Sequence, residues 1–133
     1  MVIMKARLFN LEEDYDRIAS WYAKWGYMPI PRDSVPEYGV IVSNEDVELG
    51  AVWIYRMEKN IGLLEGAVMN PEAPKNLRKE SHLFLGNVIE DLARSIGCKE
   101  VWAISKDRFI NKLCDSWGYA DYNKDFRVFK KEI

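Results

Sequence analysis

Three cations and two polar side chains lie close together in the middle of this chain. Lys75, Arg78 and Lys79 precede Ser81 and His82 in what we predict to be a polar turn before a helix. Free backbone N–H groups at a helix start attract anions, and neighbouring cations strengthen that attraction. The glycines that would let the backbone approach a pyrophosphate closely are absent. Two interpretations stay open: a phosphate site with His82 as a contact, or a solvated basic first turn.

A single carboxylate stands among apolar residues in the stretch 61–69, which we predict to be a strand. If side chains alternate along it, Leu63, Glu65, Ala67 and Met69 share one face and the intervening residues share the other. Glu65 is then either at an exposed edge of its face or held in a cleft. In a cleft, burial would raise its pKa as a general base requires.

Composition and charge exclude several classes of protein. A net charge of −2 and a sequence pI near 5.5 argue against general nucleic-acid binding. No apolar run is long enough to span a bilayer, and Lys5 and Arg7 interrupt the apolar start, so we expect no signal peptide and no membrane partner. Cys98 and Cys114 lie in no metal-binding pattern, and His82 has no second ligand at useful spacing. We therefore expect no metal site and a reducing, cytoplasmic compartment.

The hydrophobic pattern predicts one mixed α/β domain covering residues 1–133. An antiparallel meander comes first, followed by a strand-helix-strand crossover, a short helix and a closing hairpin. The predicted strands are 2–8, 39–43, 49–57, 61–69, 100–105, 120–122 and 126–131. The predicted helices are 11–25, 83–97 and 108–117, with the polar turn at 76–82. Asn10 and Asp107 are predicted N-caps, Gly26 and Gly97 end helices, and the strand 100–105 should be covered on both faces.

An aromatic helix and a proline-rich loop supply further candidates. Helical spacing joins a stripe of apolar side chains on the first helix, namely Tyr15, Ile18, Trp21, Tyr22 and Trp25. The stripe either packs on the sheet or forms a ligand wall. The loop 27–38 contains three prolines, and it either faces a substrate or only closes the core. The candidate substrate-binding residues are Trp25, Tyr27, Arg32 and Tyr38.

Two stretches resemble the GNAT superfamily, whose members transfer an acetyl group from acetyl-CoA to an amine. Residues 64–71, Leu-Glu-Gly-Ala-Val-Met-Asn-Pro, resemble the family's fourth strand and its exit. Residues 114–119, Cys-Asp-Ser-Trp-Gly-Tyr, resemble the end of the helix before its last hairpin. The resemblance covers nearly the whole chain and implies a GNAT-like fold with acetyl-CoA as co-substrate.

The resemblance also implies roles for particular residues. A backbone N–H near Val68 and Met69 would polarise the thioester, and Glu65 or an ordered water would take the amine proton. Cys114 stands where many members have a tyrosine that protonates the leaving thiolate, and Asp107 stands where an asparagine is common. The family's pyrophosphate loop is best matched by residues 78–83. The implied cofactor-binding residues are Val68, Met69, Asn70, Arg78, Lys79, Ser81 and His82.

The loop departs from the family pattern, because Ser81 and Leu83 stand where small residues belong. Such loops are similar to those of small GNAT-like proteins encoded by bacteriophages, some of which are virion or host-interaction components. Two hypotheses follow. The first is an N-acetyltransferase, as monomer or homodimer, acting on an unidentified amine in a cytoplasm, the host's if the protein is phage-encoded. The second is a non-catalytic binding or structural protein whose partner surface is the segment 21–38.

Overall fold

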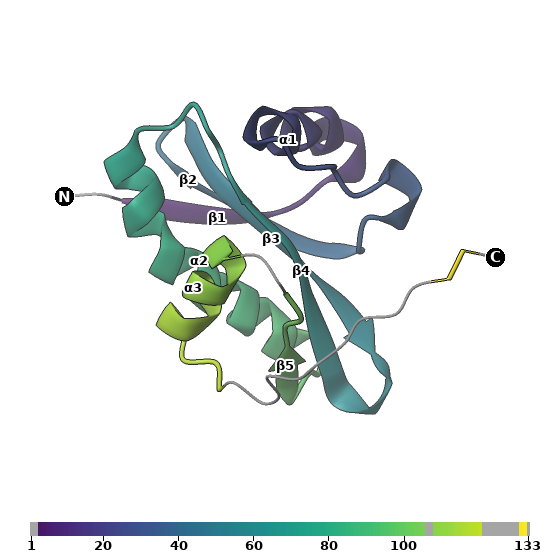
Figure 1. The fold of residues 1–133 in the computed structure, drawn as a ribbon. Helices are drawn as coiled ribbons and strands as arrows, with labels where there is room; N and C mark the ends of the chain where they lie inside the picture. Colours follow the sequence, from purple (N-terminus) through teal and green to yellow (C-terminus); the bar gives the residue numbers. More distant parts are fainter. Residues whose placement is uncertain (1–2, 106–107, 121–130, 133) are drawn as a thin grey trace.

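The described residues form a five-stranded sheet with helices on both faces (Figure 1). The computed structural model describes residues 3–105, 108–120 and 131–132. The strands are β1 (Met4–Leu8), β2 (Tyr38–Asn44), β3 (Val47–Met57), β4 (Ile61–Met69) and β5 (Glu100–Trp102). The helices are α1 (Leu11–Trp25), α2 (Lys75–Ser95) and α3 (Arg108–Ser116), with 3₁₀ turns at Arg32–Ser34 and Glu58–Asn60. Within the described ranges, no helix is long and apolar enough to cross a membrane.

The strands follow one another across the sheet in chain order. The pairs β1–β2, β2–β3 and β3–β4 are antiparallel. After the α2 crossover, β5 pairs with the other edge of β4 in parallel. The predicted mixed sheet, its meander and its crossover are therefore confirmed. The predicted closing hairpin falls mainly on residues 121–130, and the Asp107 cap on residue 107, both outside the described residues.

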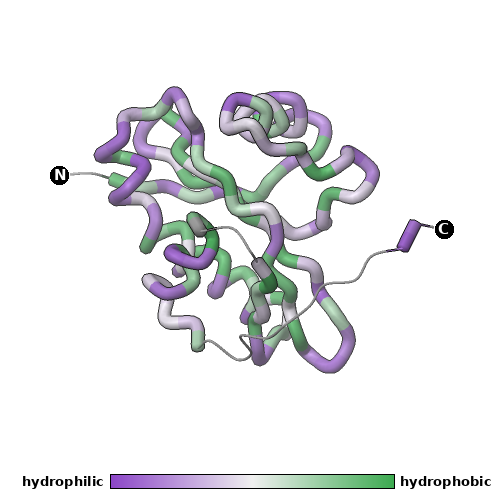
Figure 2. The backbone as a smooth tube through the Cα atoms, viewed as in Figure 1, coloured by the Kyte–Doolittle hydropathy of each residue, from purple (hydrophilic) through white to green (hydrophobic). Residues whose placement is uncertain are grey.

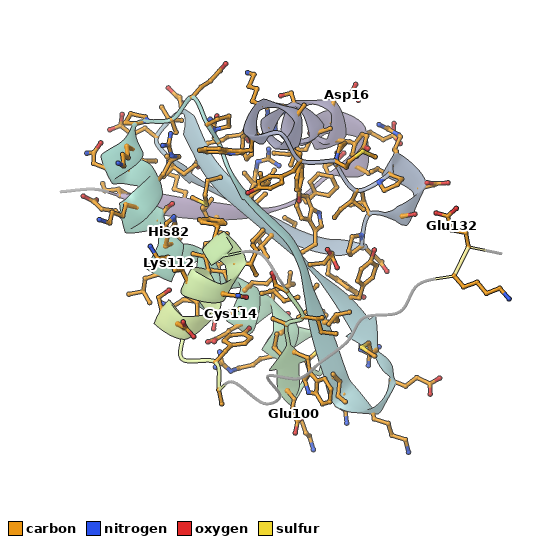
Figure 3. All side chains as sticks on the ribbon, viewed as in Figure 1. Asp16, His82, Glu100, Lys112, Cys114 and Glu132 are labelled. Atoms are coloured by element: carbon orange, nitrogen blue, oxygen red, sulfur yellow. The ribbon has the colours of Figure 1, made fainter. Side chains whose placement is uncertain are left out.

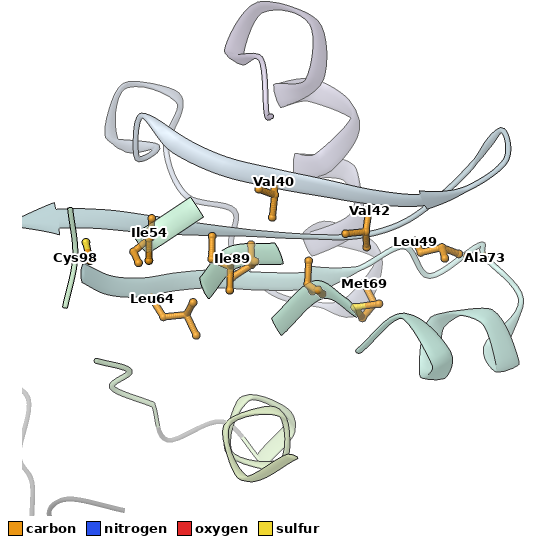
Figure 4. Close-up of a cluster of buried hydrophobic side chains, with 12 residues drawn as sticks. Val40, Val42, Leu49, Ile54, Leu64, Met69, Ala73, Ile89 and Cys98 are labelled. Carbon is orange, nitrogen blue, oxygen red and sulfur yellow. The ribbon is translucent and has the colours of Figure 1, made fainter. Parts of the chain in front are cut away.

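The sheet separates two apolar clusters. The larger cluster lies between the sheet and α2, where Leu85 and Ile89 meet Val42, Val52 and other strand residues (Figure 4). The smaller cluster packs α1 onto the opposite face. Figure 2 shows green, apolar segments gathered along the strands between the helices. Burial on both faces explains why β2 and β3 carry uninterrupted apolar runs instead of strict alternation.

Helix α1 has the ends that its sequence predicts. The Asn10 side chain accepts a hydrogen bond from the Glu13 N–H at 3.0 Å, and Gly26 ends the helix with φ +82°. Ile18 and Trp21 are buried in the smaller cluster, so the packing interpretation of the stripe is confirmed for them. The proline-rich loop also closes this cluster, because Ile30 and Val35 pack against it.

A buried carboxylate joins α1 to two strands. Asp14 accepts hydrogen bonds from Arg7 of β1 and from Arg17, and both arginines also contact Glu48 of β3. The Asn10 N–H donates a further bond to it. Burial opposes ionisation of Asp14, but these hydrogen bonds outweigh it and hold its pKa well below the usual range.

Side chains do not alternate regularly along β4, contrary to the prediction. Trp53 pairs with Glu65 and Ala51 with Val68, so β4 has an extra residue between these pairs. This β-bulge includes Gly66, whose φ is +67°. The consequence is that Met69 lies in the cluster under α2 and Val68 in the cluster under α1. Glu65 therefore faces α1, as does its partner Trp53, and does not share a face with Met69.

Helix α2 begins eight residues earlier than predicted. The segment predicted as a polar turn, 76–82, forms its first two turns, directly after Pro74. Proline is compatible with a helix start. Ser81 and Leu77 continue the buried face of Leu85, one and two turns earlier respectively. The prediction missed this because Ser81 is polar yet fully buried, with its hydroxyl donating to the Arg78 carbonyl oxygen at 2.7 Å.

Strand β5 is shorter and more exposed than predicted. Its pairing with β4 ends at Leu63 and Trp102, and it is one of the two edge strands of the sheet formed by the described residues. Trp102 and Ile104 are 44% and 46% exposed, so this segment is not the doubly covered strand that its apolar run predicts.

Candidate functional site

A cavity lies where β4 and the chain after β5 separate. The two strands pair for three residues only, and residues 103–105 then leave the sheet while β4 bends at its bulge. The cavity has a volume of about 180 Å³. Its walls come from α1 and the loop after it, from β4, from the segment after β5 and from α3. The lining residues are Tyr22, Tyr27, Leu64, Glu65, Gly66, Ala67, Ala103, Ile104, Ser105, Phe109 and Ile110.

Glu65 is the carboxylate among the described lining residues. Burial raises the pKa of its carboxyl group, and a hydrogen bond from the Gly66 backbone lowers it by less. The sequence left two positions open for Glu65, an exposed edge of its strand face or a cleft. The structure favours the cleft, with the pKa of the carboxyl group raised. Such a carboxylate can accept a proton from a neighbouring group near neutral pH.

Tyr22 fixes the bulge next to this carboxylate. Its hydroxyl donates a hydrogen bond to the Gly66 carbonyl oxygen. Burial, together with the charge of Glu65, raises the pKa of Tyr22 far above its usual value, so the hydroxyl stays protonated. A Cβ atom at Gly66 would lie 2.6 Å from this hydroxyl and 2.7 Å from Cδ1 of Ile30. A residue without a side chain at position 66 therefore allows the Tyr22 hydroxyl to reach the backbone of β4.

Side chains predicted to bind the cofactor or the substrate instead form hydrogen bonds that hold the connection between β4 and α2, residues 70–74. The Trp25 indole N–H donates to the Met69 carbonyl oxygen at 2.7 Å. Arg78 lies over the Trp25 ring and donates to the carbonyl oxygens of Pro71 and Ala73 at 3.0 and 2.6 Å. Asn70 also braces the connection, through hydrogen bonds with Glu48, Leu49 and Glu72.

Residues 78–83, matched above to a pyrophosphate loop, lie inside α2 and form no loop. Ser81 faces the core, so its hydroxyl cannot reach an external phosphate. His82 is half-buried against α3, with its ring 5.7 Å from that of Phe109. Burial, followed by the charges of Arg78 and Lys79, lowers the pKa of His82, so this imidazole is neutral at pH 7.

The start of α2 itself is a better anion site than the matched motif. Its N-cap, Pro74, makes no side-chain cap, and no acidic residue stands in the first turn. Lys75 is the first residue of the helix and is exposed, as is Lys79 one turn later. Uncapped N–H groups and cations are what a phosphate group requires. The start of α2 is therefore a candidate anion site.

The structure does not bring Cys114 to the cavity lining. Cys114 packs against the larger apolar cluster from α3, and Figure 3 shows it on the helix next to the one that carries His82. Burial, and then the charge of Asp115, raises the pKa of its thiol, which stays protonated at neutral pH. The hydroxyl of Tyr119 nearby is buried without a hydrogen-bond partner among the described residues.

Of the four candidate substrate-binding residues, only Tyr27 lines the cavity. Arg32 pairs with Glu12 and lies over the Tyr15 ring. Tyr38 packs against the cluster under α2, and Trp25 braces the β4–α2 connection as described. Sequence reasoning did not single out residues 103–105, Phe109 or Ile110, because the point at which β5 leaves β4 depends on pairing across the sheet. Gly66, inside an otherwise apolar strand, was the available signal of a bulge.

Several solved structures with the same fold are described as acetyltransferases. A probable acetyltransferase from meticillin-resistant Staphylococcus aureus has a TM-score of 0.69 at 10% identity, over 98% of this chain and 100% of that one. A GNAT family acetyltransferase from S. aureus has a TM-score of 0.64 at 19% identity, with full coverage of both chains. This chain has the GNAT fold.

Other comparisons with GNAT-fold structures agree, although sequence likeness is low. The aminoglycoside N-acetyltransferase AAC(6')-Iy, solved in complex with CoA, has a TM-score of 0.66 at 15% identity, over 99% of this chain and 96% of that one. No protein-family model matches the sequence, and no curated protein sequence matches it.

Proposed function

We propose that this protein is an acetyl-CoA-dependent N-acetyltransferase acting on a small amine. The observation that carries the proposal is a half-buried carboxylate, Glu65, in a cavity opened by the separation of β4 from the segment after β5. The GNAT fold supports the same reaction, since a relative of this fold was solved with CoA bound. A cytoplasmic protein working as a monomer or homodimer is part of this proposal.

The start of α2 is the proposed site for the phosphates of CoA. Lys75 and the first N–H groups of the helix would hold them, and Arg78 keeps the preceding connection in place. When bound there, acetyl-CoA supplies a thioester whose carbonyl carbon accepts the amine nitrogen. The backbone near Val68 and Met69 remains the proposed donor to the thioester oxygen.

Glu65 is the proposed general base. It takes a proton from the substrate ammonium group, directly or through a water, and the freed nitrogen forms the new C–N bond as the C–S bond breaks. The departing sulfur then requires a proton. Cys114 stays the sequence-based candidate for that donor, although it lies outside the described cavity lining, so a solvent proton is the alternative source. Most of the rate acceleration of acetyl transfer would come from two effects, the positioning of both substrates and the proton transfer.

Titration with acetyl-CoA tests the proposal. We expect measurable heat and a rise in melting temperature, because ligand at a hundred times its dissociation constant adds about 2.7 kcal/mol to stability. Lys75→Glu should weaken binding about tenfold, whereas Lys99→Glu, the same charge change beyond the other end of α2, should leave it unchanged. Absence of both heat and thermal shift at millimolar acetyl-CoA would contradict the proposal.

One observation favours a second candidate, a GNAT-fold binding protein without catalysis. The residues matched to the pyrophosphate loop lie within α2, and Ser81 is turned into the core. Loss of acetyl-CoA binding together with capture of a partner through the segment 21–38 would support this candidate over the enzyme.

A further inference from the structure

Trp25, the last residue of α1, contacts both the end of β4 and the start of α2. Its indole N–H donates a hydrogen bond to the carbonyl oxygen of Met69, the last residue of β4, at 2.7 Å. The guanidinium group of Arg78, in the first turn of α2, lies over the Trp25 ring, 5.6 Å from the ring centre. One rigid aromatic side chain from a third element therefore joins the strand to the helix.

The hydrogen bond from Trp25 helps to orient the peptide unit that follows the proposed thioester donor. The Met69 carbonyl oxygen accepts this bond, and the Asn70 N–H of the same peptide unit donates to the Leu49 carbonyl oxygen at 2.9 Å. Because a peptide unit is planar, these two bonds together fix its orientation. The preceding unit carries the Met69 N–H, one of the proposed donors to the thioester oxygen. The direction of that N–H therefore depends on the bond from Trp25.

Arg78 extends the effect of Trp25 to the proposed phosphate site. Its Nη1 atom donates to the carbonyl oxygens of Pro71 and Ala73 at 3.0 and 2.6 Å, just before α2 begins at Lys75. Stacking of the planar guanidinium group on the Trp25 ring restricts the directions in which these hydrogen bonds can form. The position of the first turn of α2 relative to the end of β4 is therefore set through the Trp25 ring.

We infer that Trp25 is a positioning residue for acetyl-CoA, which sets the distance between the thioester site at the end of β4 and the phosphate site at the start of α2. This inference rests on the proposed function, because it concerns the two ends of the same co-substrate. Linked groups bind together only if their sites lie at the spacing that the linker spans. A shift of one site therefore weakens the linked ligand more than it weakens either half alone.

Calorimetric titrations with acetyl-CoA and with its nucleotide half, 3′-phospho-ADP, test the inference. Trp25→Phe keeps an aromatic ring under Arg78 and removes the N–H that holds Met69. We expect the dissociation constant of acetyl-CoA to rise about three- to tenfold, the usual contribution of one hydrogen bond, and that of 3′-phospho-ADP to change less than about twofold. Trp25→Leu removes the ring as well and releases Arg78, so it should weaken the binding of both ligands.

Trp102→Phe is the matched control. Trp25 and Trp102 are both 44% exposed, and the indole N–H of Trp102 donates to the Glu100 carboxylate at 3.0 Å. This variant should leave both dissociation constants unchanged, and melting curves check that every variant is folded. Equal weakening of both ligands by Trp25→Phe, or weakening of neither, would overturn the inference and leave the proposed function standing. Failure of the wild-type protein to bind either ligand would overturn both.

Discussion

At the scale of single residues, Glu65 combines features that favour function over stability. It is half-buried, and burial raises the pKa of its carboxyl group although no cation pairs with it among the described residues. Asp14 shows the opposite arrangement, because two arginines and a backbone N–H stabilise its charge. A carboxylate kept in a partly apolar cavity without a counter-ion is available for a positively charged substrate.

We expect Glu65→Gln to lower acetyl transfer by roughly 10²–10⁴-fold, the usual contribution of a general base. The wild-type rate should rise with pH through the raised pKa of Glu65, because only the ionised carboxylate accepts a proton, whereas the variant should lack this dependence. Steady-state rates between pH 5 and 9 check this, with Glu58→Gln, in the exposed β3–β4 turn, as control. Unchanged turnover would remove Glu65 from the mechanism.

The same substitution should make the protein more stable at neutral pH. A group whose pKa is raised by folding contributes stability below its unfolded pKa of about 4.3 and loses it as pH rises through the folded pKa. Urea unfolding of Glu65→Gln should therefore show a gain relative to wild type at pH 7 that shrinks at pH 4. An equal difference at both pH values would contradict this explanation.

At the scale of elements, the bulge in β4 decides where the cavity lies. It places Met69 on the α2 side of the sheet while Glu65, before the bulge, faces α1, and it lets Tyr22 reach the strand. The parallel pairing with β5 ends on the other edge of β4 shortly before the bulge. The bulge at Gly66 and the end of the β5 pairing therefore lie next to each other on β4, on either side of Glu65.

We expect Gly66→Ala to destabilise the protein by about 1–3 kcal/mol, because its φ of +67° strains any L side chain and its Cβ would meet Tyr22 and Ile30. Gly26→Ala is the matched control, since Gly26 has φ +82° and no atom within 4 Å of a new Cβ. Urea unfolding of both variants separates backbone strain from the contact. Equal losses would show that the contact with Tyr22 contributes nothing.

At the scale of the whole molecule, a buried charged group connects the α1 layer to the sheet. Asp14 is 1% exposed and links α1 to β1 and, through the shared arginines, to β3. The network holds the α1 layer on the sheet, and Tyr22 on that helix then reaches Gly66. Stability of the α1 layer and geometry of the cavity are therefore connected.

We expect Asp14→Asn to destabilise the protein by about 1–3 kcal/mol at pH 7, because Arg7 and Arg17 lose the buried carboxylate that they share and keep only Glu48 as a charged partner. The pKa of Asp14 is lowered by folding, so its contribution is present above the unfolded pKa of about 3.9 and is lost as pH falls below it. The difference from wild type should therefore shrink at pH 3. Asp16→Asn, an exposed neighbour on the same helix (Figure 3), should cost little at either pH.

The sequence by itself determined the local features of this protein. Hydrophobic periodicity and turn residues located α1 with its Asn10 cap, the antiparallel meander and the crossover, because each depends on neighbours a few residues apart. The choice of Glu65 as a candidate also followed from its isolation among apolar residues. Only the tertiary structure decided which face Glu65 occupies, where α2 begins and which residues line the cavity. These depend on strand pairing at the Gly66 bulge and on burial of Ser81, which are set by contacts between segments far apart in the chain.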